Sequence, residues 1–168
     1  ISHVLGYNRS YSILKGKEHI QKEHKKEIID IVSMLISDIP IQYILGKSYF
    51  FGLKLELNKH VLIPRTETEE LVRWLLQEEF DSALDIGTGS GCIAITLGKY
   101  TNAKITAIDV SLDAIMIAKK NAMTNNVDIE FLEQDILKTE LNQKFDLIVS
   151  NPPYILNDYK RKIHPRII

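Results

Sequence analysis

A glycine-rich turn carries the first residues whose types and spacing point to chemistry. Residues 85–91 read Asp-Ile-Gly-Thr-Gly-Ser-Gly and lie between a predicted strand and a predicted helix. Glycines permit a tight turn and let a ligand approach the backbone closely. The unpaired N–H groups at the start of the following helix favour a negative group. The turn therefore predicts a ligand site at the end of a strand.

Two further acidic positions follow the next two predicted strands. Asp109 ends one strand, where a carboxylate can accept hydrogen bonds from both hydroxyl groups of a ribose. Asp135 and Ile136 follow the next strand, where an acidic and an apolar side chain can bracket an adenine. Together with the glycine turn, these residues predict a nucleoside pocket along the carboxyl edge of a sheet.

The spacing of the glycines decides which nucleoside site is favoured. The dinucleotide pattern G-x-G-x-x-G fails because Cys92 stands where its third glycine should be, and no Gly-Lys-Ser/Thr follows, as a phosphate-binding P-loop requires. The pattern D-x-G-x-G-x-G, with an acid at the end of the second strand, instead resembles the cofactor site of Rossmann-like methyltransferases. That resemblance implies S-adenosylmethionine as the cofactor and S-adenosylhomocysteine as its product.

A second motif, Asn151-Pro152-Pro153-Tyr154, follows the fourth predicted strand and so reaches the same sheet edge. Its residue types suit the holding of a planar nitrogen, which is a poor nucleophile and must be aimed at the methyl donor. The Asn151 side-chain carbonyl and the Pro152 backbone carbonyl can each accept one N–H, and proline stiffens the loop. Tyr154 can pack its ring on the planar group. Such positioning can lower a barrier by roughly 7–11 kcal/mol.

The elements that must position these residues follow from hydrophobic periodicity. The pattern predicts a helix over residues 18–39, ended by Pro40, and a short helical piece over 41–45. Strands are predicted over 49–51, 53–57 and 61–63. A helix is predicted to begin at Thr66, with Thr66 and Glu69 spaced as a capping box.

From residue 82 onward, predicted strands and helices alternate. The strands are 83–86, 104–108, 129–132 and 145–149, and the helices are 92–100 and 112–123, with Ser111 as the N-cap of the second. Near-continuous apolar strands of this kind are buried on both faces, as in a parallel sheet. The alternation predicts a doubly wound α/β domain of the Rossmann-like class.

Motifs spread over most of the chain resemble the HemK/PrmC family, whose members methylate the glutamine of the Gly-Gly-Gln motif in class-1 peptide chain release factors. Residues 41–46 (Ile-Gln-Tyr-Ile-Leu-Gly) resemble the segment that follows the family's N-terminal helical domain. Residues 50–52 (Phe-Phe-Gly) resemble its hairpin. Residues 61–69 (Val-Leu-Ile-Pro-Arg-Thr-Glu-Thr-Glu) resemble its Ile-Pro-Arg-Pro-Glu/Asp-Thr-Glu signature, except that Thr66 replaces a proline.

The resemblance implies a protein-(glutamine-N5) methyltransferase with three regions. Residues 1–46 form a helical region that binds the release factor, 47–65 a β-hairpin linker and 66–168 the methyltransferase domain. The cofactor-binding residues implied are Gly87, Thr88, Gly89, Ser90, Gly91, Asp109, Ile136 and Asn151. The catalytic residues implied are Asn151, Pro152 and Tyr154, and Pro153 completes the substrate pocket. Arg65 and Glu67 either hold a loop over the active site or form a surface ion pair.

Two alternatives remain open at this stage. The same Asn-Pro-Pro-Tyr pocket could grip a flipped-out adenine or guanine, as in nucleic-acid amino-methyltransferases. A second alternative is a non-catalytic module that binds the cofactor. The formal net charge of −1 disfavours the nucleic-acid alternative, although it describes only part of the protein if the chain is incomplete.

Composition excludes several classes of protein. Hydrophobic residues make up 45% of the 168 residues and charged residues 26%, which is typical of a globular protein rather than a disordered one. No apolar run reaches the ~18 residues of a membrane span. Five histidines without metal-ligand spacing predict no metal site, and the single cysteine, Cys92, fits a reducing cytoplasm. Because such methyltransferase domains have more strands than the four found here, the chain is predicted to be an incomplete copy.

Overall fold

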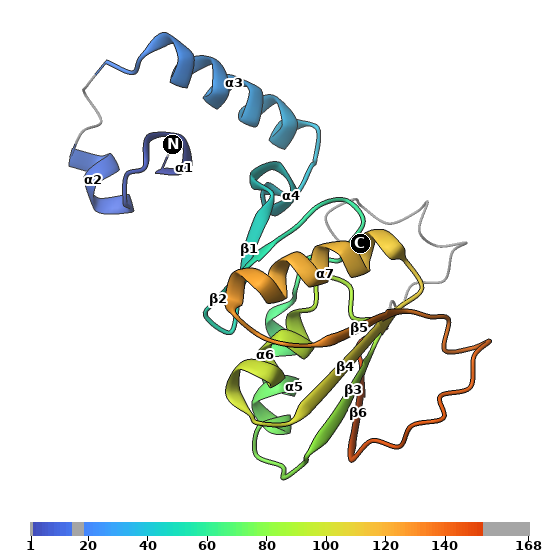
Figure 1. Cartoon of the computed structure of the whole chain (residues 1–168). Coiled ribbons are helices and arrows are strands. Elements are labelled where there is room, and N and C mark those ends of the chain that lie inside the picture. The colour runs from blue at the N-terminus through green and yellow to red at the C-terminus, as the bar shows by residue number, and fades with distance from the viewer. Residues whose placement is uncertain (1, 15–18, 153–168) are drawn as a thin grey trace.

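The structure, a computed structural model, describes residues 2–14 and 19–152, which form an N-terminal group of helices, a β-hairpin and an α/β region (Figure 1). Among the residues before the hairpin whose exposure the structure describes (2–8, 10, 11, 13, 14 and 19–46), none is fully buried, whereas Phe50 in the hairpin is 1% exposed. The main core therefore begins with the hairpin. The N-terminal helices are α1 (Ser2–Leu5), α2 (Arg9–Leu14), α3 (Lys22–Ile36) and α4 (Ile41–Leu45).

Helix α3 ends at Ile36, earlier than the predicted end at residue 39. Asp38 adopts a left-handed φ of 60°. The N–H groups of Asp38 and Ile39 donate to the carbonyls of Leu35 and Met34, respectively, which is a Schellman ending. Because a residue before proline avoids the helical conformation, the helix has to end before Ile39.

The hairpin pairs β1 (Lys47–Phe50) with β2 (Leu53–Glu56) in antiparallel register. Its turn consists of Phe51 and Gly52, with φ values of 51° and 79°. Two successive left-handed residues are typical of a tight hairpin turn whose twist matches the strands. Phe51 was predicted to belong to the first strand, but it lies in the turn.

The prediction of a strand over residues 61–63 is wrong. These residues form an irregular segment in the structure. Val61 is 3% exposed and packs with Leu57 and with Ala114 of α7 (Leu112–Asn125). Its carbonyl accepts a hydrogen bond from the Tyr43 hydroxyl at 2.9 Å. Val61 is therefore buried by packing against a helix and a tyrosine and not by pairing with another strand, whereas Leu62 stays exposed.

Helix α5 (Thr66–Leu75) begins at the predicted residue, but the predicted capping box is wrong. Arg65 occupies the N-cap position. The Glu69 carboxylate accepts the N–H of Phe51 at 2.7 Å, so it ties the helix to the hairpin turn. Val72 and Leu75 of this helix are buried in the core.

Among the described residues, four parallel strands form one sheet in the order β5-β4-β3-β6. Helix α6 (Cys92–Tyr100) connects β3 to β4, and α7 connects β4 to β5. This alternation confirms the predicted parallel α/β class. The strands are β3 (Ser82–Ile86), β4 (Lys104–Asp109), β5 (Glu130–Glu133) and β6 (Leu147–Ser150).

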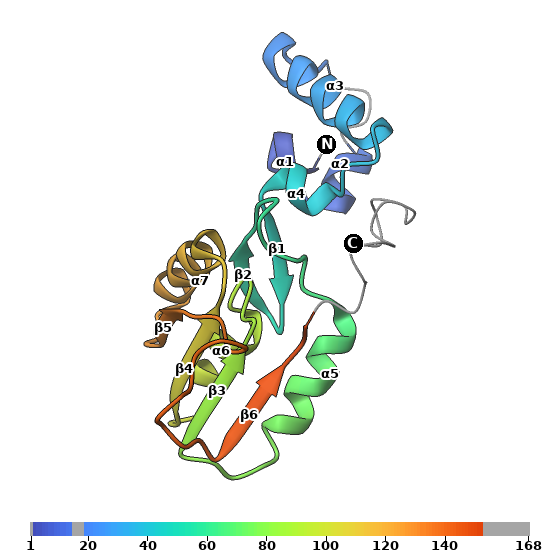
Figure 2. The ribbon, with the colours of Figure 1, turned by 90° about the vertical axis from the view of Figure 1, so that its right-hand side faces the viewer.

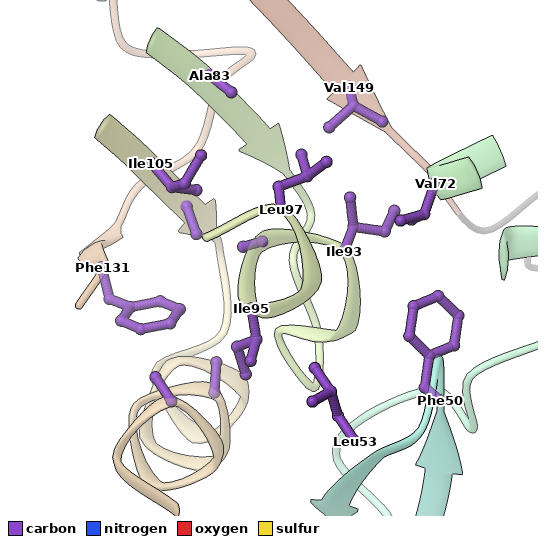
Figure 3. Close-up of a cluster of buried hydrophobic side chains, with 14 of the residues drawn as sticks. Phe50, Leu53, Val72, Ala83, Ile93, Ile95, Leu97, Ile105, Phe131 and Val149 are labelled. Carbon is purple, nitrogen blue, oxygen red and sulfur yellow. The ribbon is translucent and has the colours of Figure 1, made fainter. Parts of the chain in front are cut away.

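Helices α5, α6 and α7 lie on one side of the sheet, and the connection from β5 to β6 lies on the other (Figures 1 and 2). Figure 3 shows strand side chains such as Ala83, Ile105 and Val149 gathered around Ile93 and Leu97 of α6. The hairpin contributes its own apolar residues to this core, so the two sheets share one interior. Within the described residues, no helix combines the length and the apolar character that a membrane crossing needs.

A fully buried amide, Asn121 of α7, joins the hairpin to the glycine turn. Its Oδ1 accepts the N–H of Glu56 at 2.7 Å, and its Nδ2 donates to the Glu56 carbonyl at 3.0 Å. The same Nδ2 donates to the carbonyl of Ser90 at 2.9 Å. One side chain therefore holds the edge of β2 against the turn that follows β3.

We expect Asn121→Ala to lower the free energy of unfolding by about 3 kcal/mol, because the main-chain groups of Glu56 and Ser90 would be left without their buried partner. The exposed Lys119 on the same helix provides the control. Lys119→Ala should change the free energy of unfolding by less than about 0.5 kcal/mol. Urea unfolding measures both values, and equal effects would contradict the role of the amide.

Candidate functional site

A pocket of about 460 Å³ opens at the carboxyl ends of the parallel strands. Parallel strands end at the same sheet edge, so the connections that follow β3, β4, β5 and β6 meet there. The segment that follows β2 closes a further side. The lining residues are His60, Val61, Leu62, Ile86, Gly87, Gly89, Ile108, Asp109, Val110, Ala114, Gln134, Asp135, Ile136, Leu137 and Asn151.

The pocket brings together six of the residues that the sequence singles out: Gly87, Gly89, Asp109, Asp135, Ile136 and Asn151. They lie at or just after the ends of four different strands, so only the sheet places them together. Their roles as cofactor or substrate ligands stay predictions.

Gly87 and Gly89 have left-handed φ values of 73° and 55°. A Cβ built on either residue would meet no described atom within 4 Å. The backbone of the turn is therefore open on this side, and a side chain there would be strained and would fill part of this open space. The N–H of Gly87 donates to the Ile108 carbonyl at 2.9 Å, which holds the turn beside the end of β4.

Thr88, Ser90 and Gly91, also predicted to bind the cofactor, do not line the pocket. Thr88 and Ser90 are 5% and 2% exposed, and they support the turn from behind. Gly91 has a φ of 81°, and a Cβ there would lie 2.9 Å from the Cδ1 of Ile95. These residues shape the turn in the structure, and their contact with a cofactor stays a prediction.

The Asp109 carboxylate is held by two backbone N–H groups. Its Oδ2 accepts from Gly89 at 2.9 Å, and its Oδ1 accepts from Ser111 at 2.9 Å. A carboxylate oxygen can accept more than one hydrogen bond, so these contacts orient the group without exhausting it. The predicted ribose contact therefore has a preoriented acceptor at the pocket.

Asp85, the acid that begins the glycine motif, is 1% exposed. Its Oδ2 accepts from the Thr88 hydroxyl at 2.7 Å and from the Ala94 N–H at 3.3 Å, whereas its Oδ1 has no hydrogen-bond partner among the described residues. Burial raises the pKa of this carboxyl to about 6, and the nearby Asp109 charge also raises it. Asp85 was not among the predicted site residues, although its position near a strand end, just before the first glycines of the motif, could have indicated a role in the site.

Asn151 directly follows β6 and lines the pocket. Its side-chain Nδ2 donates to the hydroxyl of Thr68, in the first turn of α5, at 3.0 Å. The next residue, Pro152, is exposed. The predicted Pro153 and Tyr154 lie outside the described residues.

The Asp135 carboxylate turns back into its own loop. Its Oδ1 accepts from the Leu137 N–H at 3.0 Å, and its Oδ2 pairs with the Lys138 ammonium at 2.9 Å. The Lys138 hydrogen bond and the Leu137 N–H hold the pKa of Asp135 below its ordinary value. Asp135 thus shapes the turn that places Ile136 in the pocket lining.

Residues 60–62 line the pocket, although sequence reasoning assigned them no role in a site. His60 faces Asp113 at the start of α7, with Nδ1 and Oδ2 3.3 Å apart. The motif over residues 61–69 includes Val61 and Leu62, but the motif does not say that this segment, which follows the hairpin, lies at the pocket.

Arg65 and Glu67 do not line this pocket. They line a separate hollow of about 580 Å³, together with apolar residues of α3, of α4 and of the segment that precedes α5. Among the described residues, no group of three or more His, Cys, Asp or Glu side chains could hold a metal ion.

The buried Asp85 predicts a dependence of stability on pH. In the unfolded chain this carboxyl ionises near 3.8, whereas in the folded chain it keeps its proton up to about 6. Ionisation of the folded protein is therefore unfavourable, and the free energy of unfolding should fall by up to about 3 kcal/mol as pH rises from 4 to 7. Asp85→Asn, which retains an acceptor for Thr88, should remove this part of the fall. Urea unfolding across that range tests it, and parallel pH profiles for the two proteins would contradict the assignment.

Comparison with known proteins places the chain among methyltransferases. A family model described as "Methyltransferase small domain" matches residues 66–168, and one described as "PrmC N-terminal domain" matches residues 1–46. A release factor glutamine methyltransferase of Flavobacterium psychrophilum is 55% identical over 77% of this chain and 48% of its own length. One of Streptococcus pneumoniae is 42% identical over 88% of this chain and 54% of its own length. The chain thus spans about half the length of these curated relatives.

The solved structures agree on the fold. The tRNA (uracil-54, C5)-methyltransferase of Pyrococcus abyssi, solved with S-adenosyl-L-homocysteine, superposes with a TM-score of 0.56 at 23% identity. The superposition covers 72% of this chain and 30% of that one. The Rossmann-like class and the family resemblance predicted from the motifs are confirmed, and the chain belongs to the methyltransferase small-domain family.

Proposed function

We propose that this protein transfers a methyl group from S-adenosylmethionine to the side-chain amide nitrogen of the Gly-Gly-Gln glutamine in class-1 peptide chain release factors. The observation that carries the proposal is that Asn151 lines the same pocket as Gly87, Gly89 and Asp109. The names of the Flavobacterium and Streptococcus relatives support this choice of substrate. Because the chain spans about half of their length, the activity of the whole protein belongs to the proposal.

The pocket residues fit the cofactor. The open backbone at Gly87 and Gly89 admits the methionine end, the preoriented Asp109 carboxylate can accept from the ribose hydroxyls, and Ile136 offers an apolar surface to the adenine. The negative Asp109 at this edge also suits a ligand that carries positive charge. When bound, S-adenosylmethionine supplies a methyl group whose bond to sulfur breaks as the bond to nitrogen forms, giving N5-methylglutamine, S-adenosylhomocysteine and a proton.

In this proposal, Asn151 binds and orients the side-chain amide of the substrate glutamine. Its side-chain carbonyl and the backbone carbonyl of Pro152 are acceptors for the two N–H groups of a primary amide. Holding both N–H groups orients the planar nitrogen, which is the main requirement for an atom too weakly basic to react without alignment. Pro153 and Tyr154 complete this pocket in the proposal.

The same proposal assigns a part to each region of the chain. Residues 1–46 bind the release factor, 47–65 link through the hairpin and 66–168 carry out methyl transfer. The ranges matched by the two family models support the outer two assignments. A translation factor as substrate implies that the protein works in the cytoplasm.

The nucleic-acid alternative is not favoured. The match of residues 1–46 to the PrmC N-terminal domain and the names of the relatives point to a protein substrate. The Asn-Pro-Pro-Tyr pocket alone would not distinguish the two substrates, because an exocyclic amine and a primary amide are both planar nitrogens.

The proposal predicts that labelled methyl groups enter a release factor but not a variant in which the Gly-Gly-Gln glutamine is alanine. Asn151→Ala should lower this rate at least about 100-fold, because the nitrogen loses an acceptor that aligns it. The intact protein is incubated with labelled S-adenosylmethionine and, in separate reactions, with release factor, tRNA or DNA. Filter binding then measures how much labelled methyl group each substrate has taken up.

Asn102 provides a matched control, because it is an exposed asparagine just before β4, at the opposite end of that strand from Asp109. Asn102→Ala should methylate at the wild-type rate. Label in tRNA or DNA without label in the release factor would overturn the proposed substrate. Binding of the cofactor without transfer to any of the three would favour the non-catalytic alternative.

Asp109→Asn should weaken S-adenosylhomocysteine binding by about ten-fold or more, since a charged acceptor for the ribose is lost and an N–H₂ group faces backbone N–H donors. Glu133→Gln removes the same charge from the end of the neighbouring strand β5, where the side chain is exposed, and should leave the affinity unchanged. Isothermal titration calorimetry measures both. An unchanged dissociation constant for Asp109→Asn would refute the ribose assignment.

A further inference from the structure

The hydrogen bond between Asn151 and Thr68 joins parts of the chain that are 83 residues apart. Asn151 leaves the end of β6, and Thr68 lies in the first turn of α5, which runs beside β6 in Figure 2. Residues this far apart meet only because the fold places the helix next to the strand end. The contact involves the side-chain amide that the proposed function places against the substrate.

Burial and neighbouring contacts hold Thr68 in place. Its side chain is enclosed, with 6% of the residue exposed, and its N–H donates to the Arg65 carbonyl at 3.1 Å. One residue further along, the Glu69 carboxylate binds the hairpin turn, and Val72 is fully buried in the core. A threonine also has few accessible χ1 rotamers because it is branched at Cβ. The positions open to its hydroxyl oxygen relative to the end of β6 are therefore few.

An asparagine amide has two chemically different ends, and in the structure the N–H₂ end faces the Thr68 hydroxyl. The Nδ2 of Asn151 donates to the Thr68 oxygen at 3.0 Å. When the N–H₂ end faces Thr68, the carbonyl end lies on the other side of the amide carbon. Rotation about the last side-chain bond would exchange an acceptor for a donor, and a donor cannot hold the N–H groups of a substrate amide.

We propose that Thr68 is a positioning residue for methyl transfer, which accepts the N–H of Asn151 and so presents the Asn151 carbonyl to the substrate nitrogen. The proposal rests on the proposed function for the identity of the substrate. Thr68 touches neither the substrate nor the cofactor in this role, and it acts through Asn151 alone. Neither side chain titrates, so the effect of Thr68 on the rate should not vary with pH.

Kinetics of the intact protein test the role. Thr68→Val keeps the shape and removes the hydroxyl, and it should lower kcat about ten-fold while the dissociation constant of S-adenosylhomocysteine stays within about two-fold of wild type. The ratio of the two kcat values should be the same at pH 6.5 and pH 8.5. Thr68→Ser restores the hydroxyl and should recover most of kcat.

Thr96 provides a matched control. It is a fully buried helical threonine whose hydroxyl donates to the carbonyl of Cys92 in its own helix. Thr96→Val loses a hydroxyl of the same kind without touching Asn151, and it should keep the wild-type kcat. An equal loss of kcat in Thr96→Val and Thr68→Val would show a general packing effect and overturn the positioning role.

The side-chain amide of Asn151 gives a readout that does not depend on the substrate. In ¹⁵N-labelled protein, the Asn151 N–H₂ signals, assigned by their loss in Asn151→Ser, should shift in Thr68→Val and exchange faster with water. Thr68→Ser should retain the wild-type signals. If Thr68→Val does not fold, as judged by circular dichroism, Thr68→Ala removes the hydroxyl without adding apolar volume and replaces it in both experiments.

The two proposals fail in different ways. If the wild-type protein does not methylate a release factor, the proposed substrate is wrong, and the amide signals still decide whether Thr68 holds Asn151. If the wild-type protein is active and kcat is unchanged in Thr68→Val, or if the amide signals do not move, the positioning role of Thr68 is refuted.

Discussion

The parallel pairing of β3 with β4 on one side and β6 on the other is the constraint on which the site depends. In this register Asp85 lies opposite both Ala107 and Val149, so the three strands reach the same edge together. The glycine turn, Asp109 and Asn151 then meet at one pocket, although the chain between the turn and Asn151 includes two helices and three strands. A shift of β6 by one residue would turn Val149 out of the core and move Asn151 away from the pocket.

Hydrogen bonds between neighbouring elements hold the walls of the pocket at that edge. Asn121 binds both main-chain groups of Glu56 and the carbonyl of Ser90, so the hairpin and the glycine turn cannot move apart without exposing unsatisfied buried groups. Because Asn121 fixes the hairpin beside the glycine turn, the segment that follows β2 crosses the carboxyl edge of the parallel sheet. That crossing brings residues 60–62 into the pocket lining. On the β6 side, two hydrogen bonds fix α5: Glu69 accepts from the hairpin turn, and Thr68 accepts from Asn151.

Two carboxyl groups give the glycine turn its electrostatic character. Asp109 is held at the pocket by backbone N–H groups, whereas Asp85 lies beneath the turn with one oxygen unpartnered among the described residues. Burial and the charge of Asp109 both make ionisation of Asp85 unfavourable. A positively charged ligand at this edge would oppose both effects, which is consistent with the sulfonium cofactor of the proposed function.

The sequence alone determined what depends on neighbours along the chain. The strand–helix alternation, the αL glycines of the turn and the Ser111 cap, whose Oγ accepts the Ala114 N–H, all follow from short-range patterns. The motif residues at strand ends could be expected at one edge because parallel strands share their direction. Only the tertiary structure decided that residues 61–63 pack against α7 rather than pair, that Glu69 binds the hairpin turn rather than cap its own helix, and that Thr68 meets Asn151. Each of those outcomes is a competition between a local contact and one with a distant segment, and a one-dimensional pattern contains no information about which distant partner the fold supplies.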